Sequence, residues 1–130
     1  MTVVAIAVLL CFSALGISVS AGPSANCLDC MCQAYGCNNK CEGGGCGWYR
    51  ITWAYWADCG RPGPSFWGCY SNRACSRQCV VAYMKRYDVP PHTCEIYARI
   101  HMGGPNGMWT WRATNFWTKV NACCMKTGGC

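Results

Sequence analysis

Cysteines are the residues of this sequence whose number and spacing most clearly predict chemistry. Fourteen of the 15 cysteines lie downstream of residue 26, a density typical of small secreted proteins whose thiols are oxidised to disulfides. An even number allows seven bridges with no thiol left over, because Cys11 lies apart in an apolar leader. The expected disulfide cysteines are Cys27, Cys30, Cys32, Cys37, Cys41, Cys46, Cys59, Cys69, Cys75, Cys79, Cys94, Cys123, Cys124 and Cys130.

Zinc binding is the competing explanation for dense cysteines. A zinc site needs only about four ligands, and the sequence lacks two cysteine pairs with the usual spacing and intervening histidines. We therefore expect neither a metal nor a cofactor.

Acidic and basic side chains form the second reactive group. The sequence contains eleven Lys and Arg residues and five acidic residues, Asp29, Glu42, Asp58, Asp88 and Glu95, which gives a formal net charge of +6. A cation of this size favours anionic partners such as a bacterial surface, rather than nucleic acid in an extracellular setting. The alternative is that the scattered charge only keeps an aromatic-rich surface soluble.

The leader and the remainder of the chain predict a simple organisation. Residues 1–21 combine an apolar run, Val3–Leu10, with small residues before position 22, which is typical of a signal peptide. An uncleaved anchor is the alternative, although the run is short for a membrane span. Residues 22–130 are expected to form one secreted domain with a modest core that disulfides stabilise, and no later membrane span.

Four helices and one strand are expected to position the reactive residues. Helical spacing and capping residues predict helices at 27–36 (N-cap Asn26), 71–87 (N-cap Ser71 or Asn72), 94–102 and 115–121. The aromatic and β-branched run Gly47–Trp56 predicts a strand or hairpin arm that ends in a short helix. A loop is expected at Arg61–Pro64.

Five segments in order resemble the invertebrate-type lysozymes, the destabilase family. They are CLDCMC from Cys27, CGWYRI from Cys46, YWADCG from Tyr55, CVVAYMKRY from Cys79 and YARIHMGGPNG from Tyr97. The resemblance implies an α+β, small, disulfide-rich lysozyme-like fold with several short helices and a short β-hairpin beside a cleft. It also implies a muramidase, which needs one protonated and one ionised carboxyl group flanking the scissile bond of peptidoglycan.

The chain departs from the family at both expected carboxyl positions. Where the family has the acidic Glu after the first cysteine cluster, this sequence has Tyr35, whose phenol titrates near pH ~10 and is a poor proton donor. The segment that carries the family Asp is shortened to Cys41-Glu42-Gly43-Gly44-Gly45-Cys46, so Glu42 is the one possible substitute. We therefore expect the usual muramidase reaction to be impaired.

Family members have also been described as isopeptidases, which directs attention to His101 and to the hydroxyls of Ser65, Ser71 and Ser76. The alternative for His101 is a structural hydrogen bond to the following Gly103-Gly104-Pro105 turn. Arg50 replaces a family Gln and is expected to place a positive charge beside the cleft.

Seven tryptophans exceed what a core of this size needs. Aromatic faces stack on sugar rings, so Trp48, Trp109 and Trp111 are candidate exposed sugar contacts, whereas Trp56 and Trp117 are expected in the core. The alternative is that all seven pack internally.

These features together predict a secreted lysozyme-like protein that binds peptidoglycan or a chitin-like glycan with impaired catalysis, its substrate-binding residues being Trp48, Arg50, His101, Trp109 and Trp111. The alternatives are an active or weakly active glycosidase, an isopeptidase, and a non-enzymatic cationic antimicrobial or structural protein. The oligomeric state is open.

Overall fold

The computed structural model describes residues 22–130, so the expected signal peptide lies outside the described residues. The elements are α1 Ala25–Ala34, β1 Cys41–Glu42, β2 Gly45–Cys46, α2 Trp53–Asp58, α3 Phe66–Tyr70, α4 Arg73–Tyr87, α5 Cys94–Gly103 and α6 Trp111–Lys126. None of these helices is long and apolar enough to cross a membrane. The expected α+β, helix-rich fold with a small hairpin is confirmed.

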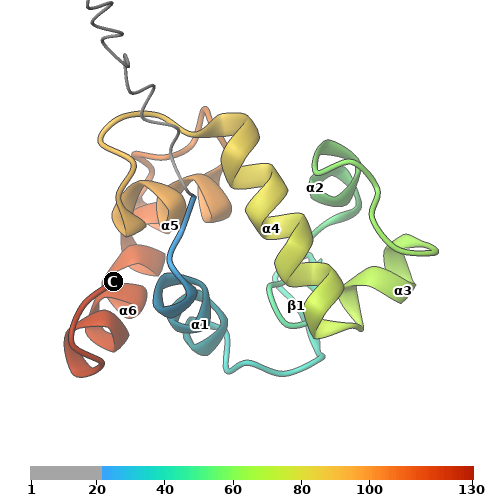
Figure 1. Ribbon diagram of the computed structural model, residues 1–130, viewed down its shortest axis with the longest axis horizontal. Coiled ribbons are helices and arrows are strands. Elements are labelled where there is room, and N and C mark those ends of the chain that lie inside the picture. Colours follow the sequence, from blue (N-terminus) through green and yellow to red (C-terminus); the bar gives the residue numbers. More distant parts are fainter. Residues whose placement is uncertain (1–21) are drawn as a thin grey trace, which may run out of the picture.

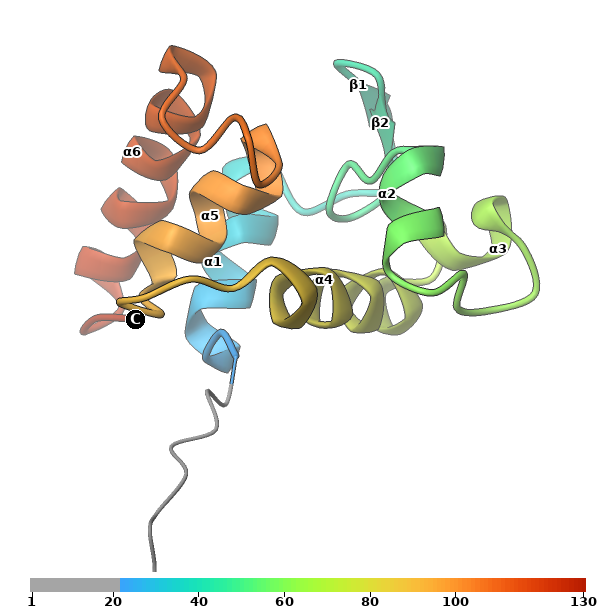
Figure 2. The same cartoon turned by 90° about the horizontal axis from the view of Figure 1, so that it is seen from above.

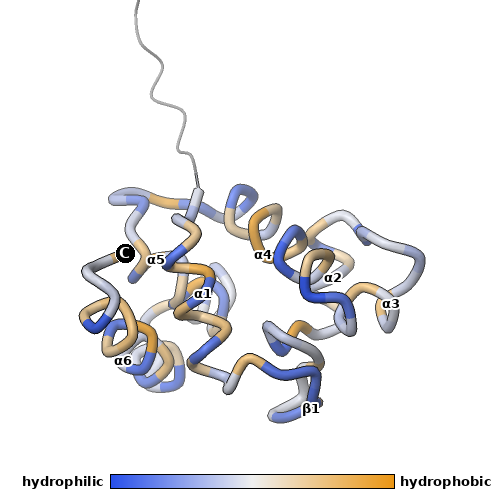
Figure 3. Tube along the Cα trace, turned by 60° about the horizontal axis from the view of Figure 1, so that its bottom comes forward, coloured by the Kyte–Doolittle hydropathy of each residue, from blue (hydrophilic) through white to orange (hydrophobic). Residues whose placement is uncertain are grey.

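The elements form two groups that α4 connects (Figure 1). Helix α6 packs on α1 and α5 in one group, while the hairpin, α2 and α3 lie in the other. Figure 2 shows the hairpin and α2 standing opposite α5 and α6, with α4 extending beside both groups. The hairpin around β1 is hydrophilic, whereas α1 and α4 carry hydrophobic segments (Figure 3).

Each helix of the described part begins at a polar capping residue. The side chains of Ser24, Thr52, Ser65, Asn72, Thr93 and Thr110 each accept a hydrogen bond from the backbone N–H three residues later. Such caps satisfy N–H groups that the helix leaves unpaired. The expected cap Asn72 is confirmed, but the expected cap Asn26 is wrong, because α1 begins earlier.

The side chain of Asn26 instead joins the two ends of the described chain. Its amide donates to Gly129 O at 2.6 Å and to Thr127 Oγ1 at 2.7 Å. Ser24 Oγ lies 3.2 Å from Cys130 O. The first and last described residues are therefore neighbours in space.

The helices expected at 71–87 and 94–102 are confirmed as α4 and α5, and the last helix is longer than expected. Of the strand or hairpin arm ending in a short helix that was expected over Gly47–Trp56, the short helix is confirmed as α2, but the strand is wrong. Residues 47–50 form a turn closed by a 3.1 Å hydrogen bond from Arg50 N to Gly47 O, and only Ile51 bridges to Cys46. Four apolar residues of this segment are buried in the core rather than aligned in a sheet: Tyr49, Ile51, Tyr55 and Trp56.

All fourteen expected cysteines form disulfides. The pairs are Cys27–Cys94, Cys30–Cys123, Cys32–Cys37, Cys41–Cys46, Cys59–Cys79, Cys69–Cys75 and Cys124–Cys130. Three sulfurs, of Cys30, Cys124 and Cys130, lie within 4.8 Å of one another. Because each is oxidised, none of them offers the thiolate that a metal ion would need.

Candidate functional site

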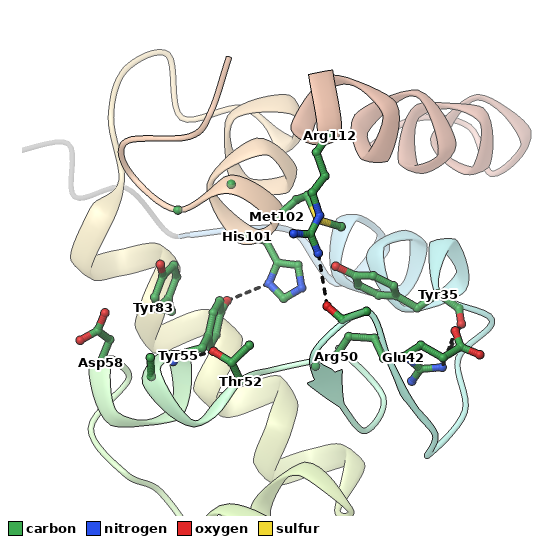
Figure 4. A pocket seen from close by; sticks show the side chains of 15 residues that line it. Tyr35, Glu42, Arg50, Thr52, Tyr55, Asp58, Tyr83, His101, Met102 and Arg112 are labelled. Atoms are coloured by element: carbon green, nitrogen blue, oxygen red, sulfur yellow. Dashed lines mark hydrogen bonds and ion pairs between the residues drawn. The ribbon is translucent and has the colours of Figure 1, made fainter. Parts of the chain in front are cut away.

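A cleft of about 440 Å³ opens between the two groups of elements (Figure 4). Every described element except α3 contributes to its walls: the end of α1, the hairpin, and helices α2, α4, α5 and α6. Polar side chains that line it are Tyr35, Glu42, Arg50, Thr52, Tyr55, Asp58, Tyr83, His101 and Arg112. The cleft thus brings together four residues singled out in the sequence, Tyr35, Glu42, Arg50 and His101.

Tyr35 follows the last turn of α1, and its ring packs against two neighbouring aromatic rings. The ring stacks on Phe116 with centroids 4.8 Å apart and meets His101 edge-on at 5.9 Å. Its hydroxyl points into the cleft toward Arg112 (Figure 4) and makes no hydrogen bond within residues 22–130. Burial raises the pKa of Tyr35 above its usual value, although Arg112 and Arg50 oppose this. The phenol therefore remains protonated and is a very weak acid.

Glu42 is the carboxylate nearest to Tyr35 along the cleft wall. It ends β1, where the 64 % exposed side chain places Oε2 3.7 Å from Arg50 Nη2. In Figure 4 this pair lies on the hairpin side, away from the second carboxylate of the cleft, Asp58. Asp58 accepts a hydrogen bond from the Tyr87 hydroxyl at 3.2 Å, which joins α2 to the end of α4.

Arg50 is only 8 % exposed, and its guanidinium donates hydrogen bonds to the backbone around it. Nη1 donates to Asn38 O at 2.8 Å and to Gly47 O, while Nη2 donates to Asn38 Oδ1 at 2.7 Å and to Tyr35 O at 3.3 Å. The guanidinium thus fastens the segment after α1 to the turn before α2. The expected positive charge is present, but most of its donors are occupied by the protein itself.

His101 is buried in α5 and connects the two sides of the fold. Since the Tyr49 carbonyl only accepts, Nε2–H of His101 donates to it at 3.0 Å, and Nδ1 accepts from the Tyr55 hydroxyl at 2.8 Å. Burial lowers the pKa of His101 to about 4, against the opposing effect of the Tyr49 hydrogen bond. The ring is therefore neutral near pH 7, and its structural partners are Tyr49 and Tyr55 rather than the Gly103–Pro105 turn.

The three serines considered as nucleophiles serve local structure. Ser65 caps α3, the Ser71 hydroxyl donates to Trp67 O, and the buried Ser76 hydroxyl donates to Arg73 O. Both ring nitrogens of His101 already have other partners. The described residues therefore contain no Ser–His hydrogen bond of the kind that a serine nucleophile needs.

The tryptophans divide between core and surface. Trp109 and Trp111 are 72 % and 81 % exposed, as expected, and Trp56 is buried. Trp48, expected to be exposed, is half-buried: Arg73 lies over its ring at 5.5 Å and its Nε1 donates to Ser71 O at 3.4 Å. One face of Trp109 is covered by the Arg99 guanidinium, 4.8 Å from the ring centroid, which leaves the other face open.

Sequence reasoning missed several polar residues of this cleft, Thr52, Tyr55, Tyr83 and Arg112, and did not single out Trp53 beside it. Trp53 is 55 % exposed and lies in α2 next to Thr52 and Ala54, which both line the cleft, although Trp53 itself does not. Arg112 reaches across the cleft from the start of α6, with Nη2 3.5 Å from Gly43 O (Figure 4). An aromatic residue at a helix N-terminus was a usable signal for Trp53, whereas the contact of Arg112 depends on tertiary structure alone.

Comparisons with known proteins agree with this architecture. The family model described as destabilase matches residues 24–123. The chain is 41 % identical to a lysozyme of Magallana gigas over 107 residues, 75 % of this chain and 78 % of that protein. It is 39 % identical to an invertebrate-type lysozyme of Ruditapes philippinarum over 113 residues, 77 % and 83 % of the two chains.

A solved structure resembles the fold as well. The lysozyme of Meretrix lusoria, crystallised in complex with Aeromonas hydrophila PliI, superposes with a TM-score of 0.74 at 37 % identity. The match covers 86 % of this chain and all of the other.

Proposed function

Because this chain belongs to the destabilase family of invertebrate-type lysozymes, we propose that its cleft binds peptidoglycan or a related chitin-like glycan while hydrolysing it poorly or not at all. The observation that carries this proposal is the phenol of Tyr35 in the cleft, at the position where the family resemblance places the catalytic acid. Its raised pKa makes protonation of a leaving sugar oxygen unfavourable.

The other acidic groups of the cleft support the same conclusion. The Glu42 side chain is solvent-exposed and its carboxylate lies 3.7 Å from the Arg50 guanidinium, which is unlike the apolar setting of a carboxyl group that acts as a catalytic acid. Asp58 lies at the other end of the cleft in Figure 4 and is held by Tyr87. Two carboxyl groups must flank one bond at about 5–10 Å from each other for either stereochemical course of glycoside hydrolysis.

Glycan binding is supported by the mixed lining of the cleft and by two exposed tryptophans, Trp109 and Trp111. Hydroxyls and guanidinium groups supply hydrogen-bond donors for sugar hydroxyls, and Trp109 presents one free face on which a pyranose ring could stack. Trp111 adjoins the cleft residue Arg112 in the sequence. We assign Trp109 and Trp111 to sugar contacts, and His101 to shaping the cleft floor.

We place the protein outside the cell, where its seven disulfides would persist and where bacterial walls are accessible. A relative is bound by a bacterial protein, PliI, in a crystal structure. The positive charge of this chain would add attraction to anionic walls.

The test combines lysis with binding. Oxidised protein, residues 22–130, is incubated with a Gram-positive wall suspension, alongside Meretrix lusoria lysozyme as the comparator, and is then sedimented with insoluble peptidoglycan. We expect co-sedimentation without lysis, and a several-fold loss of binding in the Trp109→Ala/Trp111→Ala variant. Lysis well above a heat-denatured control, or no sedimentation, contradicts the proposal.

Residual glycosidase activity is the second candidate, because Glu42 and Asp58 do line the same cleft. If lysis is observed, Glu42→Gln should abolish it under this alternative. The Glu95→Gln variant is the matched control, because Glu95 lies in α5 and pairs with Arg99 outside the cleft.

A further inference from the structure

Two arginines line the cleft, and they differ in how the protein compensates their positive charge. Arg50 is paired with Glu42 and hydrogen-bonded to backbone carbonyls. Arg112 forms no ion pair with any carboxylate among residues 22–130, and its one polar contact there is the 3.5 Å approach to Gly43 O. A contact at that distance is at the limit of a hydrogen bond. Arg112 is therefore the cleft cation whose charge the protein leaves uncompensated.

A second donor faces the same space. The Tyr35 hydroxyl points into the cleft beside the Arg112 guanidinium (Figure 4) and has no partner in the described chain. Arg112 lies close enough to affect the ionisation of Tyr35. The two carboxylates of the cleft are engaged elsewhere, Glu42 with Arg50 and Asp58 with Tyr87. This part of the cleft thus offers a planar cationic fork and a hydroxyl donor.

From this arrangement, and resting on the proposed glycan binding, we propose that Arg112 and Tyr35 form a subsite for the carboxylate of an acidic sugar. A guanidinium binds a carboxylate through two parallel N–H···O bonds, and charge-assisted bonds of this kind are stronger than those to neutral hydroxyls. Neutral sugars would use the rest of the cleft without engaging this pair. The protein then prefers carboxylate-bearing glycans over neutral chitin-type chains.

The Arg112 contact with Gly43 also predicts how the subsite is filled. Gly43 lies in the hairpin turn with a positive φ of 60°, and Arg112 spans from α6 to that turn. A carboxylate would replace one weak carbonyl contact by two strong ones, so the guanidinium can turn to it at little cost.

The experiment measures binding of matched oligosaccharides by calorimetry. The ligands are chitotetraose, a hyaluronan tetrasaccharide with glucuronate carboxylates, its carboxyl-reduced form, and a peptidoglycan disaccharide carrying the lactyl carboxylate of muramic acid. Wild-type protein should bind at least one carboxylate ligand about tenfold or more tightly than chitotetraose. Which of the two acidic ligands is preferred distinguishes a host-type uronic acid from a bacterial wall sugar.

Variants assign the preference to the subsite. Arg112→Ala should remove the preference and leave the affinity for chitotetraose within about twofold, Arg112→Lys should keep part of it, and Tyr35→Phe should lower it several-fold. Lys85→Ala is the matched control: Lys85 is an exposed residue of α4 outside the cleft, and its substitution removes one positive charge, as Arg112→Ala does.

Three results are decisive. Selective loss of the acidic ligand in Arg112→Ala, with Lys85→Ala unchanged, supports the subsite. Equal weakening of neutral and acidic ligands, or a wild type without preference, overturns it while glycan binding stands. If no ligand binds at all, the proposed function fails and the subsite fails with it.

Discussion

Tyr35 and His101 share one wall of the cleft, and burial moves both away from proton exchange near neutral pH. For Tyr35 the charged form is the phenolate, so desolvation raises its pKa. For His101 the charged form is the imidazolium, so desolvation lowers its pKa to about 4. The wall next to Arg112 is therefore uncharged at pH 7, and a ligand there meets hydrogen-bond donors and aromatic faces.

The buried His101 makes the stability of the protein depend on pH. Below the ordinary histidine pKa of 6.5, the His101 imidazole of the unfolded chain is protonated, whereas in the folded protein it stays neutral down to about pH 4. The free energy of unfolding should therefore fall by roughly 1.4 kcal/mol per pH unit within that window and be unaffected by this group above it. Guanidinium denaturation at pH 7.5 and 5.0 measures the difference, which we expect to be about 2 kcal/mol from this residue.

The matched variant is His101→Gln, which can donate and accept but does not titrate in this range. It retains the second histidine of the described chain, His92, with its 2.9 Å contact to Asp88. An equally steep loss of stability toward pH 5 in this variant would contradict the assignment to His101.

The residues of the site were only partly predictable from the sequence. Tyr35 and Glu42 could be found because the resemblance to the family marks where its two carboxyl groups stand, and both residues do line the cleft. Arg112 could not be found, since its role depends on α6 packing so that its side chain reaches the hairpin turn. His101 was expected to bond its own following turn, yet its partners come from residues 49 and 55.

At the scale of elements, local signals predicted the helices better than they predicted residues 47–56, several of which line the cleft. Helices α4 and α5 have a clear cap and helical spacing, and both form as expected. Residues 47–56 are aromatic and β-branched, and they form the expected short helix at their end, α2, but a turn in place of the expected strand. Gly47 and Arg50 adopt positive φ angles of 80° and 50°, outside the extended region of a regular strand, and Tyr49, Tyr55 and Trp56 are buried in the core. The sequence signal for burial was read as a signal for a sheet.

The turn at Gly47 gives a prediction for this element. A Cβ at Gly47 would lie 2.0 Å from Tyr70 O, whereas one at Gly44, with a similar positive φ of 87°, meets nothing within 4 Å. Gly44→Ala should cost about 1 kcal/mol from backbone strain alone. Gly47→Ala should cost at least about 2 kcal/mol more, because backbone must move, and should weaken glycan binding by displacing Arg50.

Chemical denaturation of the two alanine variants provides the comparison, with near-ultraviolet circular dichroism reporting on the aromatic core. Equal stabilities for the two variants would show that the turn at residues 47–50 yields easily, and would contradict the tight approach to α3.

In the whole molecule, disulfides and a small core together hold two groups of elements around the cleft. The bridge Cys27–Cys94 joins α1 to α5 across 67 residues, while Cys41–Cys46 closes only five within the hairpin. In the chain-entropy view, the longer loop stabilises by about 4 kcal/mol and the shorter by about 2 kcal/mol.

Paired replacement by serine tests this difference. The Cys27→Ser/Cys94→Ser variant should lose roughly twice as much unfolding free energy as Cys41→Ser/Cys46→Ser, as measured by guanidinium denaturation under non-reducing conditions. The hairpin variant should instead lose more glycan affinity, because Glu42 and Gly43 line the cleft. A larger stability loss in the hairpin variant would contradict the loop-length argument.

The close approach of the two ends of the described chain has a consequence for how the molecule can be rearranged. Ser24 and Asn26 hydrogen-bond to residues 127–130, so a short peptide could join residue 130 to residue 22 without disturbing any helix. New ends could then be opened at the exposed Gly63-Pro64 loop. We expect such a circular permutant to fold with all seven disulfides, although the hairpin and α2 would then follow α5 and α6 in the chain.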